Sequence, residues 1–256
     1  MISVEDALAH LFTLVEPLEA EIVDLKDACG RVLAQPVSAK RDQPPFAASV
    51  MDGYAICAED YLAGKALTVL GESAAGARFN GVMRAGEAVR IFTGAPVPKG
   101  ADWVVIQEDV TKISNQITIR ETTETSSYIR PAGADFKEGQ TLDAAQVLTP
   151  QTIALLASMN IAKVPVTRRP EVALISTGTE LVMPGEEPGE DQIIASNTFG
   201  LKAMLEQMGA RVRLLPIAHD TLPALRMAFD LAQGADLIID ADLLLRGLSD
   251  GRRLAQ

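Results

Sequence analysis

A short apolar run followed directly by hydroxyl and carboxyl groups is the feature that most constrains this sequence. Glu171–Ile175 is rich in β-branched and aliphatic residues and follows Pro170, a pattern typical of a buried parallel strand. Ligands of open α/β sheets bind beyond the carboxyl ends of the strands. The loop after this strand therefore predicts a binding site, and its residues are Ser176, Thr177, Gly178, Thr179 and Glu180.

The composition of this loop suits an anionic ligand held beside a cation. Gly178 allows backbone N–H groups to approach an anion, and the neighbouring hydroxyls add donors. Glu180 places a negative charge beside that anion, which is favourable mainly if a cation or a proton lies between them. A polar loop that only caps the next element has the same composition, and the residues alone leave both interpretations open.

From about Lys163 the sequence alternates between strand-like and helix-like segments. This rhythm indicates a parallel sheet with helices on its faces. Each predicted helix stops at a glycine, which is a common helix end. The predicted elements are strands at Val172–Ile175, Val212–Leu215 and Leu237–Ile239, a helix with Asn197 as N-cap, and a helix over Thr221–Gln233.

Asp220 follows the second of these strands. Because parallel strands end at one edge of a sheet, Asp220 is expected at the same edge as Glu180. An aspartate just before a helix start is also a common capping neighbour, so this position has a structural interpretation as well.

The N-terminal region predicts helices and a short strand. Ser3 begins a capping-box pattern ahead of an amphipathic helix that ends before Pro17. A short strand is predicted at Ile22–Leu25. A second helix is predicted from Thr149, as N-cap, to about Met159, and we expect it to pack against the first.

Between Phe46 and about Gln140, short apolar runs are separated by glycine, proline and asparagine. Regularly spaced short strands with this punctuation indicate a small β domain, inserted between the two helices. Its strands are predicted at Tyr54–Ile56, Leu67–Leu70, Ala88–Phe92, Trp103–Ile106 and Gln116–Ile119.

Two stretches of this β domain carry polar residues next to glycine. Asp52 precedes Gly53 at a strand start, where an Asp-Gly pair is a common hairpin signal. Thr93 lies where the strand Ala88–Phe92 leaves into a Gly/Pro turn. Its hydroxyl suits a ligand contact, although many such threonines only close turns.

Composition and charge exclude several classes of function. The chain has 256 residues, of which 48% are hydrophobic, and a net charge of −11 argues against nucleic-acid binding. The two cysteines fit no metal-site spacing, and the sequence shows neither a signal-peptide pattern nor an apolar run of about 18 residues. These observations predict a cytoplasmic protein with reduced thiols and no membrane span.

Several catalytic motifs are missing from the sequence. It contains no phosphate-binding GxxxxGK[ST] loop, no strand-associated GxGxxG, no HExxH and no nucleophile elbow. With only two histidines, a serine or cysteine triad is disfavoured. What remains is acid-rich phosphate chemistry assisted by a hard cation, or binding without catalysis.

Taken in order, these stretches resemble the molybdopterin molybdenumtransferases, relatives of the C-terminal domain of gephyrin. The matches extend over about the first 239 residues, and their order makes them specific where each alone would be weak. They are Cys29–Ala34, Pro44–Phe46, Ser49–Ala55, Arg90–Pro98, Gly100–Asp102, Arg130–Phe136 and Ser176–Leu181, with Ser196, Asn197 and Asp220 at further motif positions.

The resemblance implies an α/β multidomain fold. Residues 1–45 and 141–165 would form a helical and linker domain, residues 46–140 an inserted small β domain, and residues 166–245 an incomplete α/β parallel-sheet molybdopterin-binding domain. Residues 246–256 would form a divergent tail, and the family's C-terminal β domain is expected to be absent.

The resemblance also implies a reaction in molybdenum cofactor biosynthesis. Molybdate would be inserted into adenylylated molybdopterin with release of AMP and with Mg²⁺ involved. The protein would be a homodimer, and other proteins of molybdenum cofactor synthesis are candidate partners. The implied residues are Asp52, Glu180 and Asp220 as catalytic carboxylates, Glu180 and Asp220 as Mg²⁺ ligands, and Thr93, Ser176, Thr177, Gly178, Asn197 and Ser249 as substrate contacts.

Two departures from the family pattern leave alternatives open. Thr179 stands where the family usually has aspartate, and Arg246 and Arg252 stand where it has a glycine and an acid. A non-glycine residue in a tight anion-binding turn is prone to strain. One alternative is a shortened, catalytically impaired pterin-binding or scaffold protein. The other is a nucleotide pyrophosphatase that shares only the α/β domain.

Overall fold

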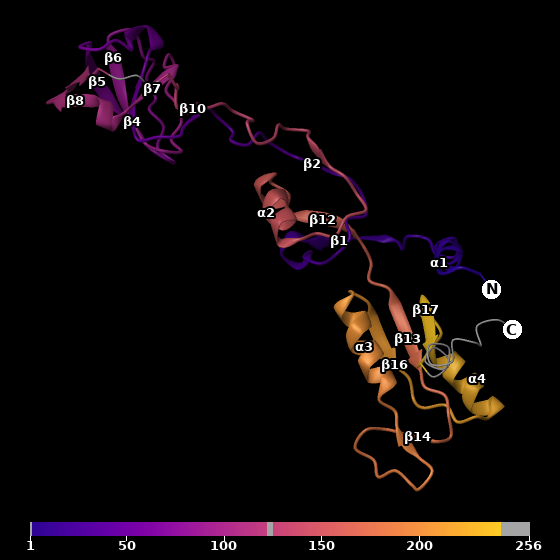
Figure 1. Cartoon of the computed structure of the whole chain (residues 1–256). Helices are drawn as coiled ribbons and strands as arrows, with labels where there is room; N and C mark the ends of the chain where they lie inside the picture. The colour runs from indigo at the N-terminus through magenta and orange to yellow at the C-terminus, as the bar shows by residue number, and fades with distance from the viewer. Residues whose placement is uncertain (1, 122–124, 242–256) are drawn as a thin grey trace. The chain divides into compact units, whose positions relative to one another are not determined.

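The computed structural model describes residues 2–121 and 125–241, which separate into two compact units (Figure 1). The first, here the α/β unit, contains Met1–Gln35, Ala144–Pro150 and the described chain from Lys163 onward. The second, here the β unit, contains Pro36–Asp143 and Gln151–Ala162.

Three parallel strands form the central sheet of the α/β unit, in the order β16, β13, β17. Strand β13 (Glu171–Ile175) lies between β16 (Arg211–Leu214) and β17 (Leu237–Asp240). Four of the five residues of β13 are buried, as expected for a parallel strand covered on both faces. The predicted parallel sheet is thereby confirmed.

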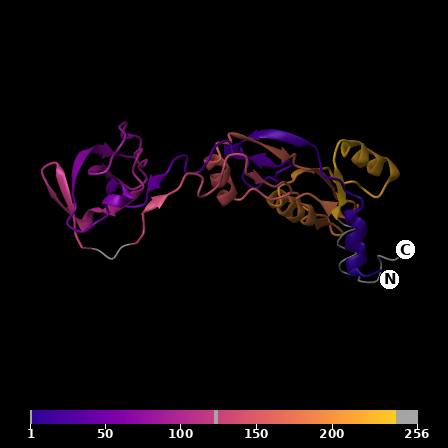
Figure 2. The same cartoon turned by 90° about the horizontal axis from the view of Figure 1, so that it is seen from above.

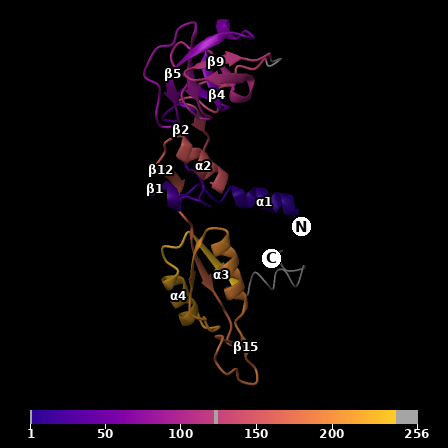
Figure 3. The same cartoon turned by 90° about the vertical axis from the view of Figure 1, so that its left-hand side faces the viewer.

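Helices α3 (Asn197–Gln207) and α4 (Leu222–Leu231) cover opposite faces of this sheet (Figures 2 and 3). Alternate residues of a strand point to opposite faces. Leu174 of β13 accordingly packs in the cluster that contains Leu201 of α3, whereas Ile175 packs in the cluster that contains Leu225 of α4.

The predicted N-cap of α3 is wrong by one residue. Ser196, not Asn197, occupies the N-cap position, and Asn197 is the first residue of the helix. The reason is that the first hydrogen bond of the helix runs from the Gly200 amide to the Ser196 carbonyl. Thr221, where the second helix is predicted to begin, is the N-cap of α4, since its side chain accepts from the Ala224 amide.

A two-stranded antiparallel sheet of β1 (Ala20–Asp24) and β12 (Lys163–Thr167) belongs to the same unit. The predicted strand at Ile22–Leu25 corresponds to β1, whereas β12 lies outside the predicted strands. Pro165 is the middle residue of β12. Because proline cannot donate a backbone hydrogen bond, a sequence that contains it is not readily predicted as a strand.

The first helix, α1 (Val4–Phe12), begins as predicted at Ser3. The Ser3 hydroxyl accepts from the Asp6 amide at 3.0 Å and donates to the Asp6 carboxylate at 2.7 Å. No residue of α1 is buried within the described chain. The second predicted helix lies mostly in the other unit, so its packing against the apolar stripe of α1 stays a prediction.

The β unit is built on a six-stranded sheet in the order β7, β4, β6, β5, β9, β8. All five predicted strands are present. The sixth strand, β8, is not among the predicted strands. Only one of its four residues is buried, so its sequence lacks a clear apolar pattern. The strands are β4 (Gly53–Ile56), β5 (Ala66–Ser73), β6 (Glu87–Ile91), β7 (Trp103–Ile106), β8 (Val110–Ile113) and β9 (Gln116–Ile119).

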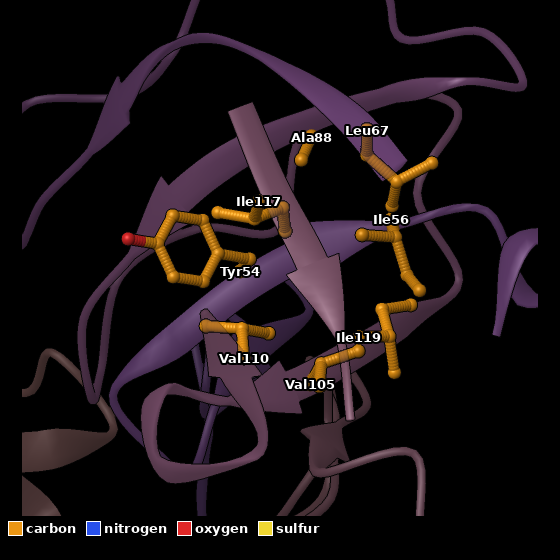
Figure 4. Packing of buried hydrophobic residues seen from close by; sticks show 8 residues of the cluster. All are labelled: Tyr54, Ile56, Leu67, Ala88, Val105, Val110, Ile117 and Ile119. Carbon is orange, nitrogen blue, oxygen red and sulfur yellow. The ribbon is translucent and has the colours of Figure 1, made fainter. Parts of the chain in front are cut away.

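Apolar clusters cover both faces of this sheet. Figure 4 shows one of them, in which Tyr54 and Ile56 of β4 meet Leu67 of β5 and Ile117 of β9. The other contains Ala55, the residue between Tyr54 and Ile56. Burial on both faces explains why all four residues of β4 are buried.

Shorter elements complete the two units. The β unit contains the paired strands β2 (Val37–Ser38) and β11 (Thr141–Leu142), the pair β3 (Ala48–Ser49) and β10 (Ile129–Arg130), and most of helix α2 (Pro150–Ser158). In the α/β unit, β14 (Leu181–Val182) pairs with β15 (Ile193–Ile194). Single 3₁₀ turns are η1 (Leu25–Asp27), η2 (Ala58–Asp60) and η3 (Gln107–Asp109).

Candidate functional site

In the β unit, the carboxylate of Asp52 is held by Thr93. Its Oδ1 accepts hydrogen bonds from the Thr93 amide and the Thr93 hydroxyl, both at 2.8 Å. These bonds, the backbone one first, and the positive charge of Arg90 lower the pKa of Asp52 below its ordinary value. The arrangement keeps Asp52 ionised and joins two of the residues that the resemblance implies.

The Asp52 turn is not the hairpin that its Asp-Gly pair suggests, because β3 pairs with β10 and not with β4. Glycine is needed at position 53 for a different reason. A Cβ built on Gly53 would lie 2.0 Å from the Val105 carbonyl oxygen, a separation that no side chain can adopt. The turn is therefore set by close packing of β4 against β7.

A cavity of about 510 Å³ opens beside this turn. It combines apolar walls with hydroxyl, cationic and carboxylate groups, a mixture that orients small polar ligands. Arg130 and Asp135 form an ion pair at its wall. Its lining includes Pro44, Phe46, Ser49, Thr93, Arg130 and Asp135.

In the α/β unit, the loop after β13 lies against the segment after β16. The Gly178 amide donates to the Ala218 carbonyl at 3.1 Å, and the Ala218 amide donates to the Ser176 carbonyl at 2.9 Å. The Asp220 amide donates to the Thr179 hydroxyl at 3.3 Å. The predicted shared strand-end edge is thus present, with the Glu180 loop and Asp220 beside each other.

The hydroxyls of this loop are used within the protein. The hydroxyl oxygen of Ser176, a buried residue, lies 3.4 Å from that of Thr198. Thr177 donates to Asp240, with oxygen separations of 3.0 and 3.2 Å. Thr179 accepts from Asp220, so each of the three hydroxyls has a protein partner.

Gly178 and Glu180 form a compact pair. Gly178 has a φ of +144°, and a Cβ there would lie 2.5 Å from the Glu180 Oε2 atom. The Glu180 side chain therefore folds back over Gly178. Because the Gly178 amide already donates to Ala218, this glycine serves to seat the Glu180 carboxylate rather than to offer its own N–H to an anion.

Two implied substrate contacts and the implied metal site remain to be placed. Asn197 is exposed in the first turn of α3, and Ser249 lies outside the described residues, as do Arg246 and Arg252. Within residues 2–121 and 125–241, no group of three or more histidine, cysteine, aspartate or glutamate side chains is arranged to hold a metal ion. In the same residues, no helix has the length and apolarity needed to cross a bilayer.

Comparison with known proteins places this chain in a family. The family model that describes the MoeA N-terminal region (domain I and II) matches residues 2–160 of this chain. The chain belongs to the MoeA family. The predicted resemblance to the molybdopterin molybdenumtransferases is confirmed.

Curated relatives of this MoeA-family chain are described as molybdopterin molybdenumtransferases. The molybdopterin molybdenumtransferase of Nostoc sp. is 38% identical over 94% of this chain, and that of Haemophilus influenzae is 36% identical over 91%. The chain spans 58% and 59% of the length of these two relatives.

Solved structures of a molybdopterin biosynthesis MoeA protein from Pyrococcus horikoshii show the same fold. One aligns with a TM-score of 0.83 at 30% identity, covering 98% of this chain and 66% of that one. A second aligns with a TM-score of 0.75 at 32% identity, covering 93% and 64%. The predicted α/β multidomain fold is confirmed.

Asp240 is a residue of this MoeA-family chain that sequence reasoning missed. It ends β17, and its pairing with Ile175 at the end of β13 brings it beside Thr177. The available signal was its position, because a polar residue at the carboxyl end of a parallel strand lies at the ligand edge of the sheet.

Proposed function

We propose that this chain acts in molybdenum cofactor biosynthesis as a molybdopterin molybdenumtransferase. The reaction inserts molybdate into adenylylated molybdopterin and releases AMP. The observation that carries the proposal is the ionised Asp52 held by Thr93 beside a cavity of mixed polarity, in a chain of the MoeA family.

The roles proposed for individual residues follow from chemistry. Asp52, Glu180 and Asp220 are the catalytic carboxylates, which act by holding cations and protons near the phosphate groups of the substrate. Thr93, Ser176, Thr177, Gly178, Asn197 and Ser249 are proposed to contact or shape the substrate site. For Ser176 and Thr177 the hydrogen bonds within the protein favour the shaping role.

Glu180 and Asp220 are the proposed ligands of Mg²⁺. They lie on neighbouring loops at the strand-end edge of the α/β unit, and hard cations prefer carboxylate oxygens. When bound, Mg²⁺ would neutralise the negative charge of the diphosphate and molybdate groups. The two carboxylates would hold the cation at this edge.

The proposed assembly is a cytoplasmic homodimer with a helical and linker domain, an inserted β domain and an α/β domain. The apolar face of α1 supports a dimer, because Val4, Leu8, Leu11 and Phe12 are all exposed. Both cysteines are free thiols, in keeping with a reducing compartment. Light scattering at concentrations of about tens of micromolar should show the dimer, and a monomer there would contradict it.

The nucleotide pyrophosphatase alternative is disfavoured by the extent of the family match. That alternative shares only the α/β domain, whereas the match covers residues 2–160 and includes the β unit with Asp52. The scaffold alternative rests on Arg246 and Arg252, which lie outside the described residues. An assay of AMP release distinguishes the scaffold alternative from the proposed enzyme.

The test is AMP release from adenylylated molybdopterin with saturating molybdate and Mg²⁺. Asp52→Asn should lower the rate by about 10²–10³, the usual cost of losing one charged group aimed at the reaction. Glu59→Gln, an exposed carboxylate of the β unit, is the matched control and should leave the rate unchanged. If calorimetry detects binding of the substrate but no AMP is released, the proposed enzyme activity is contradicted and the scaffold alternative is supported.

A further inference from the structure

Arg90 of β6 is held by two aromatic rings. Its guanidinium carbon lies 5.1 Å from the ring centre of Tyr54 and 4.8 Å from that of Phe92. Arg90 pairs directly with Tyr54 across β6 and β4, and Phe92 follows two residues later. Stacking on aromatic rings suits the flat guanidinium and directs its N–H groups outward from its edge.

The N–H groups of Arg90 reach the turn that carries Asp52. Its Nη1 donates to the Gly53 carbonyl at 3.2 Å, and its Nη2 donates to the Gln107 side chain at 2.6 Å. The backbone amide of Gln107 donates in turn to the Asp52 carbonyl at 3.0 Å. Arg90 therefore fixes the residue after Asp52 and also the residue that binds the Asp52 backbone.

Asp52 uses one carboxylate oxygen for its protein contacts. In the described residues, its hydrogen bonds from the Thr93 amide and hydroxyl both end on Oδ1. Oδ2 keeps its capacity to accept a hydrogen bond or to bind a cation. The direction in which Oδ2 is presented depends on the orientation of the Asp52 backbone, which the Arg90 contacts set.

We propose that Arg90 is a positioning residue for Asp52, holding the turn so that Thr93 binds Oδ1 and Oδ2 is presented to the substrate. This inference rests on the proposed catalytic role of Asp52. Arg90 acts through Gly53 and Gln107. Lysine should replace it only in part, because an ammonium has the charge but lacks the planar fork that reaches two acceptors while stacked.

The test measures hydrogen exchange of two amides by NMR at neutral pH. The Thr93 amide reports the Asp52 contact. The Ile119 amide lies on β9, two strands from β6 in the same sheet, and donates to the Lys65 carbonyl, so it reports the stability of the sheet as a whole. Arg90→Met should speed exchange at Thr93 by about tenfold and change Ile119 by less than about twofold, since only the local opening becomes easier.

Two further variants control the experiment. Arg90→Lys should give an intermediate increase at Thr93, a partial rescue by the conservative change. Arg120→Met removes an arginine of the same unit that bonds Thr111 instead, and it should leave both amides unchanged. Equal acceleration at Thr93 and Ile119 in Arg90→Met, or no change at Thr93, would overturn the proposal in favour of a purely structural role.

Activity supplies an independent readout. If Asp52 is catalytic, Arg90→Met should lower kcat for AMP release by about tenfold or more while KM changes little, because a misdirected carboxylate affects the transition state most. A variant that raised KM alone would contradict positioning of Asp52. Full activity of Asp52→Asn would instead refute the proposed function, while the exchange result at Thr93 would still decide what Arg90 does.

Discussion

Asp52 in the β unit and Glu180 in the α/β unit are both carboxylates beside a glycine, but they are supported differently. Around Asp52 the constraint is backbone against backbone, since Gly53 packs against the Val105 carbonyl. Around Glu180 the constraint is the carboxylate itself, which folds over Gly178. The comparison teaches that one turn is fixed by backbone packing in the sheet, whereas the other is shaped by contact with a side chain.

The largest expected effect comes from adding one methyl group at each glycine. Gly53→Ala places a Cβ 2.0 Å from backbone and should cost roughly 3 kcal/mol or more, because two strands must separate. Gly178→Ala displaces mainly the flexible end of Glu180 and adds strain from its positive φ, about 1–2 kcal/mol.

Denaturation followed by Trp103 fluorescence reports the β unit, and amide exchange in β13 reports the α/β unit. Gly200→Ala is the control, because nothing lies within 4 Å of a Cβ built there and alanine favours helix by about 1 kcal/mol. Similar losses of stability in Gly53→Ala and Gly178→Ala would contradict the claim that the two turns are constrained differently.

A smaller effect is expected on the use of Mg²⁺. Glu180→Gln or Asp220→Asn should raise the Mg²⁺ concentration needed for half-maximal AMP release by about 10–100-fold, because carboxylate oxygens hold the cation. Melting temperatures should change less than the Mg²⁺ response, because each substitution keeps the size of the side chain and removes only its charge. Asp230→Asn, an exposed position of α4, is the control. A loss of stability as large as the loss of Mg²⁺ response would assign these carboxylates a structural role.

Strong periodicity explains which parts of the fold could be predicted. Strand β13 and helix α4 combine apolar patterns with clear ends, and their place in the α/β unit follows from alternation alone. Strand β8 lacks that signal because only Val110 is buried. The β12 strand is hidden by Pro165, because a proline inside a run of residues argues against a strand.

The candidate site was predictable in its residue types but not in its contacts. Asp52 and Thr93 are 41 positions apart, and only the topology of the β unit brings them together. The link between Thr177 and Asp240 spans 63 positions and depends on the register of β13 with β17. Whether a hydroxyl serves a ligand or its own protein is decided by such register, which residue types do not encode.

Substitution of two threonines, one beside each carboxylate site, tests the difference between the two units with smaller expected losses of stability. Thr177→Val removes the hydroxyl bound by Asp240 and should destabilise the α/β unit by about 1–2 kcal/mol, the cost of removing a charge-assisted hydrogen bond. Thr93→Val should cost less, about 0.5–1 kcal/mol, because the Thr93 amide still donates to Asp52. The free energies of unfolding from urea titrations measure both. A larger loss for Thr93→Val would mean that its hydroxyl, and not its amide, holds Asp52.

The smallest effect concerns acid, and it is expected in the α/β unit. Apolar clusters support both units, but in the α/β unit an ion-pair network also links the residues that precede β1 and β17. There Arg168 donates to both oxygens of Asp236 at 2.6 Å and to Glu19 at 2.7 Å. The Arg168 hydrogen bonds lower the pKa of Asp236 from 3.8 to about 2.

A carboxylate with a lowered pKa in the folded state stabilises the protein above its unfolded pKa, and this stabilisation is lost as the pH falls. For Asp236 the loss should begin near pH 4 and be complete below about pH 2. Because the pair is partly exposed, the loss should be about 1 kcal/mol or less. The protection of the Glu171 amide, whose N–H donates to Asp236, is its exchange rate relative to the intrinsic rate at the same pH. This protection should fall across the range before Trp103 fluorescence changes. Asp236→Asn should remove that pH dependence and Asp230→Asn should keep it. If fluorescence and exchange instead change together at the same pH, the two units unfold as one and the contrast between them does not hold.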